Sequence, residues 1–228
     1  MRVAEIYLSI QGEGFLTGAE SVFIRASGCN LRCWFCDTPY ASWTPEGDDL
    51  SVAEIVAQVV EYRCRHVVLT GGEPMLFAEL APLAATLRRR GLHVTIETAG
   101  TLDLFVECDL MSLSPKLAGS TPAARRHPRW SRRHDETRHA PHVIRRLVRD
   151  YEYQVKFVVD QPADCELVRE YLDLFPEMDR GRVMLMPQGT DPDALARRAE
   201  WLRTYCEEAG LLFCPRRHIE WFGLVRGT

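Results

Sequence analysis

Three cysteines lie close together in the segment SGCNLRCWFCDTPY, at Cys29, Cys33 and Cys36. Thiolates with the spacing C-x3-C-x2-C can converge on one centre if the segment is a loop that leaves a strand. A structural zinc site needs four ligands, and here the fourth would have to come from a distant residue such as Cys64 or His66. A [4Fe–4S] cluster held by three thiolates instead leaves one iron open to a small chelating molecule. The pattern therefore predicts such a cluster, and zinc is the alternative.

The composition fits one soluble domain of ordinary size. The chain has 228 residues, of which 46% are hydrophobic, and a net charge of −4. This charge gives no reason to expect a nucleic-acid partner, no apolar run has the length of a membrane span, and the amino terminus lacks a signal-peptide pattern. The five other cysteines stand singly, so we expect buried thiols rather than disulfides. We expect a cytoplasmic protein with no nucleic-acid or membrane partner.

Apolar strands and amphipathic helices alternate along most of the chain. Strands are expected at Ser21–Ser27, His66–Thr70, His93–Thr98, Cys108–Ser114, Tyr153–Asp160 and Arg182–Pro187, and helices at Ser51–Arg63, Ala78–Gly91, Ala163–Leu174 and Asp193–Gly210. About six β-then-α units predict an α/β fold with a parallel sheet, either doubly wound or curved. Because the distinctive residues follow strand ends, which share one rim in a barrel, we predict a single domain, 1–228, built as a partial TIM-type barrel.

One segment, Gly119–Asp150, breaks this rhythm. It contains nine arginines and four histidines against three acidic residues. Such a segment can bind anions or nucleic acid, but aromatic residues are sparse within it. We therefore interpret 119–150 as a solvated, partly helical insertion that covers an interface. Its histidines, His127, His134, His139 and His142, do not repeat at a metal-ligand spacing.

The cysteine loop resembles the signature of radical S-adenosylmethionine enzymes, in which an aromatic residue, here Phe35, precedes the last cysteine. The segment TGGEP (70–74) resembles the glycine-rich motif with which that superfamily binds the methionine end of the cofactor. Glycines such as Gly72 let the backbone approach a ligand closely, and Glu73 offers an acceptor for an ammonium group.

More of the chain resembles one family of this superfamily, the 7-carboxy-7-deazaguanine synthases of the queuosine precursor pathway. The matching segments are SIQGEG (9–14), FIRASGCNLRCWFCDT (23–38), LTGGEP (69–74), IETAG (96–100), SPK (114–116) and HIEWFGLVRGT (218–228). The resemblance implies conversion of 6-carboxy-5,6,7,8-tetrahydropterin to 7-carboxy-7-deazaguanine with loss of ammonia. A 5′-deoxyadenosyl radical would abstract hydrogen from C6 before ring contraction, so the radical chemistry is carried by the cluster and S-adenosylmethionine.

The resemblance also assigns the cofactor residues. Cys29, Cys33 and Cys36 would hold the [4Fe–4S] cluster, and Thr38 would bind Mg²⁺, a hard ion suited to a hydroxyl oxygen. S-adenosylmethionine would be bound by Phe35, Cys36, Asp37, Gly72, Glu73, Glu97, Ser114, Pro115, Lys116, Met186, Pro187, Gln188 and Gly189. The wording of MPQG (186–189) differs from the family pattern at that position, and Asp37 can equally cap a turn.

Substrate contacts are implied for residues from both ends of the chain, namely Ile10, Gln11, Gly12, Glu13, Arg25, Thr70, His218 and the terminal Thr228. An arginine within a buried strand, such as Arg25, needs an anion, either a substrate carboxylate or a neighbouring acidic side chain. The QGEG segment can be a polar turn, and the carboxyl terminus can be a frayed end. A homodimer and an electron donor such as flavodoxin or ferredoxin are also implied.

Two other functions remain as alternatives. A glycyl-radical activase would share the cysteine loop but act on a protein, whereas QGEG, Arg25 and SPK favour a small anionic substrate. A zinc-binding module would use the three cysteines with a distant fourth ligand.

Overall fold

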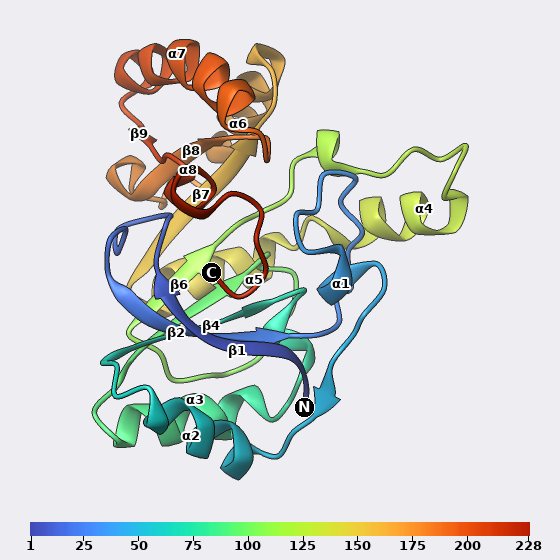
Figure 1. Ribbon diagram of the computed structural model, residues 1–228. Coiled ribbons are helices and arrows are strands. Elements are labelled where there is room, and N and C mark those ends of the chain that lie inside the picture. Colours follow the sequence, from blue (N-terminus) through green and yellow to red (C-terminus); the bar gives the residue numbers. More distant parts are fainter.

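A single mixed sheet forms the centre of the computed structural model, which describes all 228 residues (Figure 1). Its strands are β1 Arg2–Ile10, β2 Glu20–Ala26, β3 Asp48–Asp49, β4 His66–Gly71, β5 His93–Thr98, β6 Leu110–Leu113, β7 Tyr153–Val159, β8 Val183–Pro187 and β9 Leu212–Phe213. Their spatial order is β3-β1-β2-β4-β5-β6-β7-β8-β9. The helices are α1 Pro39–Ser42, α2 Val52–Glu61, α3 Leu80–Arg89, α4 Pro128–Thr137, α5 Pro141–Asp150, α6 Pro162–Asp173, α7 Pro192–Ala209 and α8 Arg217–Phe222, with short 3-10 turns at Pro74–Leu76, Ala118–Ser120 and Arg180–Arg182.

The six predicted strands are present as β2 and β4–β8, and each pairs with the next in parallel. The sheet is open, because β3 and β9 are its free edges, and this confirms the predicted partial barrel. The strand β1 was not predicted. It pairs antiparallel with β2, and its residues are mostly half-buried, so its sequence has neither the continuous apolar run of a central strand nor a tight-turn signal before β2.

The parallel strands present two different faces, because successive side chains on a strand point to opposite sides. One face packs against helices and contributes Ile24, Leu69, Ile96, Met111 and Phe157 to the main hydrophobic core. The residues beside them, Arg25, Thr70, Glu97, Ser112 and Lys156, line a cavity on the other face. The strands are therefore not apolar on both faces. The inner face, which lines the cavity, has polar residues at alternate positions of the strands.

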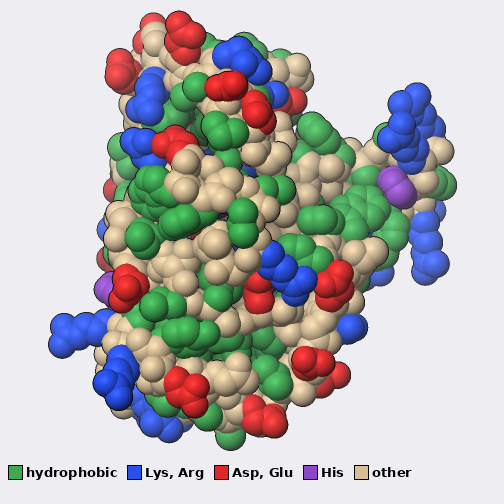
Figure 2. Space-filling model, in the orientation of Figure 1, with side chains coloured by type: hydrophobic (Ala, Val, Ile, Leu, Met, Phe, Trp, Pro, Cys, Tyr) green, Lys and Arg blue, Asp and Glu red, His purple; other side chains and the backbone are tan.

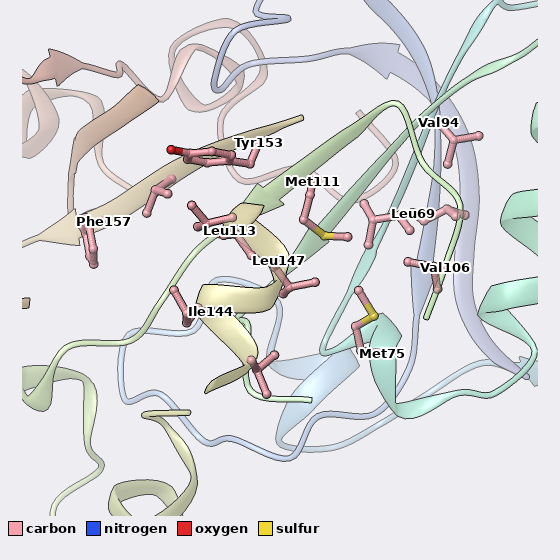
Figure 3. Packing of buried hydrophobic residues seen from close by; sticks show 14 of the residues in the cluster. Leu69, Met75, Val94, Val106, Met111, Leu113, Ile144, Leu147, Tyr153 and Phe157 are labelled. Carbon is pink, nitrogen blue, oxygen red and sulfur yellow. The ribbon is translucent and has the colours of Figure 1, made fainter. Parts of the chain in front are cut away.

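The helix α5 belongs to the main core, although its sequence is rich in arginine. Its residues Val143, Ile144, Leu147 and Val148 are all buried in that core. Figure 3 shows Ile144 and Leu147 beside Met111 and Leu113 of β6. The basic segment 119–150 is thus two different parts: α5 is the crossover helix between β6 and β7, and only the part that carries α4 projects from the body (Figure 1).

No helix of the structure combines the length and the apolar character that a membrane crossing requires.

The packing of α5 predicts that Leu147→Ala lowers the free energy of unfolding by about 2–5 kcal/mol, because a fully buried leucine leaves a cavity in the core. Denaturant unfolding measures the change. Arg149→Ala on the exposed side of the same helix is the control, and we expect it to change stability by less than about 0.5 kcal/mol, since its ion pair with Asp150 is solvent-exposed. Equal effects of the two substitutions would contradict the placement of α5 in the core.

Candidate active site

A cavity of about 570 Å³ lies on the inner face of the sheet. Most residues predicted for the site line it: Ile10, Gln11, Gly12, Glu13, Arg25, Cys29, Cys33, Phe35, Cys36, Asp37, Thr38, Thr70, Gly72, Glu97, Ser114, Lys116, Met186, Gln188, His218 and Thr228. Four predicted residues do not line it, namely Glu73, Pro115, Pro187 and Gly189. Pro115 lies at a smaller adjoining cavity of about 160 Å³, which also contacts Phe35, Lys116 and Gln188.

The three cysteines of the loop after β2 are free thiols, and all three line this cavity. The amide of Leu31 donates to Cys29 Sγ at 3.4 Å, and Ser42 Oγ lies 3.1 Å from Cys36 Sγ. Burial raises the pKa of Cys29 to about 12 and that of Cys33 to about 11, so both thiols need a bound metal to become thiolates.

These thiols fit a cluster better than a single metal ion. The structure contains no group of three or more His, Cys, Asp or Glu side chains arranged around one ion position. A zinc site requires its ligands around one ion, whereas an iron–sulfur cluster distributes its thiolates over several irons. The zinc alternative therefore lacks its ligand set.

Two glycines allow the loop after β4 to pack directly against the cysteine loop. A Cβ on Gly72 would lie 2.2 Å from the carbonyl oxygen of Gly28 and 2.4 Å from that of Ala41. Gly71 has a φ of +142°, and a Cβ there would lie 2.1 Å from the carbonyl oxygen of Ala26. Any side chain at either position would push the two loops apart.

Glu73 has a structural role that its motif did not reveal. Its side chain is fully buried, where its carboxylate accepts hydrogen bonds from Thr98 Oγ1 at 2.8 Å, the Ala99 amide at 2.9 Å and the Met75 amide at 3.1 Å. Burial raises the pKa of Glu73, although these hydrogen bonds oppose the shift. The carboxylate thus ties the GGEP loop to the end of β5.

A buried lysine on β7 connects two acidic residues at the centre of the site. Lys156 is 2% exposed, and its Nζ donates to Glu97 Oε1 at 2.8 Å and to Glu13 Oε2 at 3.0 Å. The other oxygen of Glu97 accepts from Thr70 Oγ1 at 2.9 Å. Burial opposes the charge of Lys156, but the two carboxylates raise its pKa above the ordinary value. Lys156 therefore remains an ammonium group between the two acidic side chains.

A second cation, Arg216, joins the amino-terminal loop to the cysteine loop. Its Nε donates to Glu13 Oε1 at 3.1 Å, its Nη2 pairs with Asp37, and its Nη1 donates to the carbonyl oxygen of Gly189 at 2.8 Å. Burial raises the pKa values of Glu13 and Asp37, but the neighbouring cations more than offset this and hold both below their usual range. His218 Nδ1 lies 3.8 Å from Glu13 Oε1.

Arg25 is partly neutralised by the protein itself. Its Nε donates to Glu5 Oε1 at 2.6 Å and its Nη2 to the Tyr7 hydroxyl at 2.7 Å, so the neighbouring acid considered from the sequence is Glu5. The Tyr40 hydroxyl also donates to Glu5 at 2.7 Å. Nη1 of Arg25 makes no hydrogen bond within the protein, and the side chain lines the cavity. One edge of the guanidinium is thus free for an anion.

The carboxyl-terminal segment 223–228 lies across the cavity and contributes six consecutive residues to its wall (Figure 1). Arg226 holds it in place by donating to Glu46 Oε2 at 3.0 Å, to Glu5 Oε2 at 3.3 Å and to the carbonyl oxygen of Ala4 at 3.0 Å. On the opposite wall, Lys116 Nζ donates to Ser114 Oγ at 2.8 Å and to the Ser114 carbonyl oxygen.

Four charged residues that line the cavity were missed from the sequence, namely Glu5, Lys156, Arg216 and Arg226. Lys156 could have been predicted, because it lies inside the apolar run YQVKFVVD. A cation within a buried strand needs an anion beside it, as was argued for Arg25. Glu5 lies on the strand that was not predicted, and Arg216 follows the two-residue strand β9. Neither has a local pattern that distinguishes it from a surface charge.

Known proteins resemble the chain at the level of both sequence and fold. Residues 23–149 match the radical SAM superfamily. A 7-carboxy-7-deazaguanine synthase of Rhodopirellula baltica is 48% identical over 99% of this chain and 88% of the relative. A 7-carboxy-7-deazaguanine synthase of Halobacterium salinarum is 42% identical over 95% of this chain and 88% of the relative.

Among solved structures, QueE from Escherichia coli aligns with a TM-score of 0.70 at 23% identity, covering 94% of this chain and 92% of that one. Streptococcus suis SuiB bound to S-adenosylmethionine aligns with a TM-score of 0.55 at 16% identity, covering 84% of this chain and 45% of that one. These two likenesses concern the fold. On the similarity of sequence along nearly its whole length, the chain belongs to the 7-carboxy-7-deazaguanine synthase family of the radical SAM superfamily.

Proposed function

We propose that this chain makes 7-carboxy-7-deazaguanine from 6-carboxy-5,6,7,8-tetrahydropterin with release of ammonia. The observation that carries the proposal is one cavity lined both by three free thiols and by a group of buried and half-buried charges, formed by Glu13, Glu97, Lys156, Arg25 and Arg216. Membership of the family supports the same activity.

The thiols of Cys29, Cys33 and Cys36 would hold a [4Fe–4S] cluster, with S-adenosylmethionine on the iron that has no protein ligand. Together these groups supply a 5′-deoxyadenosyl radical when bound. Gly72, Ser114 and Lys116 line the cavity where the methionine end would lie, and Lys116 keeps one N–H of its ammonium free for a carboxylate. Thr38, which lines the cavity next to Asp37, would bind Mg²⁺ through its hydroxyl oxygen.

The free edge of Arg25 would receive the carboxylate of the pterin, because a guanidinium edge matches a carboxylate. Glu97 and Glu13 would accept hydrogen bonds from ring N–H groups, and the ion pairs with Lys156 and Arg216 hold these carboxylates in place. Gln11 and Thr70 line the same region, and His218 and the carboxyl-terminal Thr228 complete it. The segment 223–228 crosses the cavity, which suits a small molecule better than the polypeptide substrate of a glycyl-radical activase.

The proposed function predicts that the anaerobically reconstituted protein converts the carboxytetrahydropterin to 7-carboxy-7-deazaguanine when it receives S-adenosylmethionine and dithionite. Liquid chromatography with mass spectrometry detects the product. An enzyme that cleaves S-adenosylmethionine but forms no deazaguanine would contradict the proposed substrate and leave the superfamily assignment standing.

The cysteine loop predicts that Cys36→Ala loses the iron that reconstitution gives to the unsubstituted protein, about four per chain. Product formation should disappear with the iron. Cys108→Ala is the control, because Cys108 is also a partly buried free cysteine but lies outside the cavity. This variant should retain both the iron and the product formation. Equal iron contents of the two variants would contradict the ligand assignment.

The buried charges predict that Lys156→Met raises the pKa of Glu13, because a cation that holds this pKa down is removed. The acidic limb of the kcat/KM profile should then move to higher pH. The free energy of unfolding should also fall, because the half-buried carboxylates of Glu13 and Glu97 lose a shared cation. Lys156→Arg keeps the charge and should restore the pH profile at least in part. A profile that is the same in all three proteins would show that Lys156 does not act through Glu13.

A further inference from the structure

The projecting part of the basic segment is attached to the cysteine loop from outside the cavity. The Trp34 amide donates to the carbonyl oxygen of Ser120 at 3.1 Å, and Trp34 Nε1 donates to that of Gly119 at 2.7 Å. The amide of Arg32 donates to Nδ1 of His134, a fully buried residue of α4, at 3.1 Å. Because Nδ1 accepts this bond, Nε2 carries the proton and donates to Ser120 Oγ at 2.8 Å. A partner that binds α4 is therefore held beside the cysteine loop.

This part of the chain is strongly basic, although the whole chain is acidic. Residues 118–140 contain six arginines and two acidic residues, whereas the chain has a net charge of −4. Arg125, Arg126 and Arg129 are exposed and form no salt bridge. Figure 2 shows basic side chains gathered on the lobe that projects to the right of the body. The unpaired charge is available to an acidic partner.

A side chain of the cysteine loop reaches the surface where it contacts Gly119, at the start of the segment that carries these arginines. Trp34, between Cys33 and Cys36 in the sequence, is 52% exposed. Trp130 of α4 stacks with the guanidinium groups of Arg32 at 4.0 Å and Arg133 at 5.3 Å. Aromatic residues and arginine are the residue types enriched at protein–protein contacts. We call the surface formed by Trp34, Arg125, Arg126, Arg129 and Arg133 the α4 surface.

We propose that the α4 surface docks an acidic protein that delivers single electrons to the cluster, of the flavodoxin or ferredoxin type. The inference rests on the proposed function, since the cluster needs one electron for each reductive cleavage. In the step itself the partner's reduced flavin or iron–sulfur centre loses one electron and the cluster gains it, and no bond forms or breaks in the transfer. Complementary charge brings the partner to the side of the protein where the cysteine loop is exposed, and this raises the rate of productive encounter.

A nucleic acid fits the same surface less well. The basic patch is confined to one lobe of a chain that is otherwise acidic, so an extended polyanion that continued past the lobe would be repelled. A compact protein with one acidic face can contact the lobe and the cysteine loop without meeting the acidic body.

The test measures binding of a purified acidic flavodoxin to the reconstituted enzyme by calorimetry without substrate, and then stopped-flow oxidation of the reduced flavodoxin by the cluster. The triple variant Arg125→Glu/Arg126→Glu/Arg129→Glu should bind at least about tenfold more weakly at low salt, and its cluster should be reduced correspondingly more slowly. High salt should weaken binding to the unsubstituted enzyme but change the variant little.

The matched control is Arg65→Glu/Arg89→Glu/Arg90→Glu, which reverses three exposed arginines near the amino-terminal ends of β4 and β5, whereas the cysteine loop follows the carboxyl end of β2. It should bind and accept electrons like the unsubstituted enzyme. With dithionite as reductant, both triple variants should form product at the unsubstituted rate, because no substituted residue lines the cavity. A failure of all three proteins with dithionite would count against the proposed function alone, since the binding measurement contains no substrate.

Equal flavodoxin affinity for the unsubstituted enzyme and the α4 triple variant would overturn the proposal. So would a change in oligomeric state of that variant in light scattering, because the arginines would then belong to a contact between two copies of the chain. Binding of a short RNA to the unsubstituted enzyme, lost in the α4 variant, would overturn it as well if flavodoxin binding is unaffected.

Discussion

The site depends on one buried ammonium group that is shared by two carboxylates from distant parts of the chain. An ionised group loses its hydration when it is buried, and only well-placed partners compensate for this cost of several kcal/mol. Lys156 on β7 meets Glu13, which follows β1, and Glu97, on β5. These contacts fix the amino-terminal loop over the inner face of the sheet. Arg216 extends the same network to Asp37 and so to the cysteine loop.

The cysteine loop itself is held from two sides. Inside the fold, the absence of side chains at Gly71 and Gly72 lets the loop after β4 contact the backbone of residues 26, 28 and 41. Outside, His134 of α4 and the carbonyl groups of Gly119 and Ser120 bind its amides and Trp34. A loop with two fixed sides can present three thiols to the cavity in one arrangement, as a cluster with defined ligand positions requires.

The sequence was informative wherever a local pattern has a direct structural cause. Continuous apolar runs located the six parallel strands, and the cysteine spacing and GGEP located the loops that follow two of them. The motif did not indicate the hydrogen bonds that Glu73 accepts inside the protein from Thr98 and two backbone amides. The local pattern misled at α5, where the count of arginines concealed an apolar stripe.

Residues that act through long-range pairing were the hardest to predict. Arg25 was expected to need an anion, but its partner Glu5 lies on β1, a strand whose half-buried pattern resembles a loop. Arg216 and Arg226 gain their roles because the end of the chain returns to the cavity. Such contacts depend on topology, which spacing along the sequence does not specify.

In the proposed site, three thiolates hold a cluster whose remaining iron is kept for S-adenosylmethionine. Mössbauer spectroscopy of protein reconstituted with ⁵⁷Fe tests it most directly, because each iron site contributes its own signal. We expect a [4Fe–4S] spectrum in which one of the four irons changes when S-adenosylmethionine is added and the other three do not. A spectrum that S-adenosylmethionine leaves unchanged, or protein that binds zinc in place of iron, would contradict it.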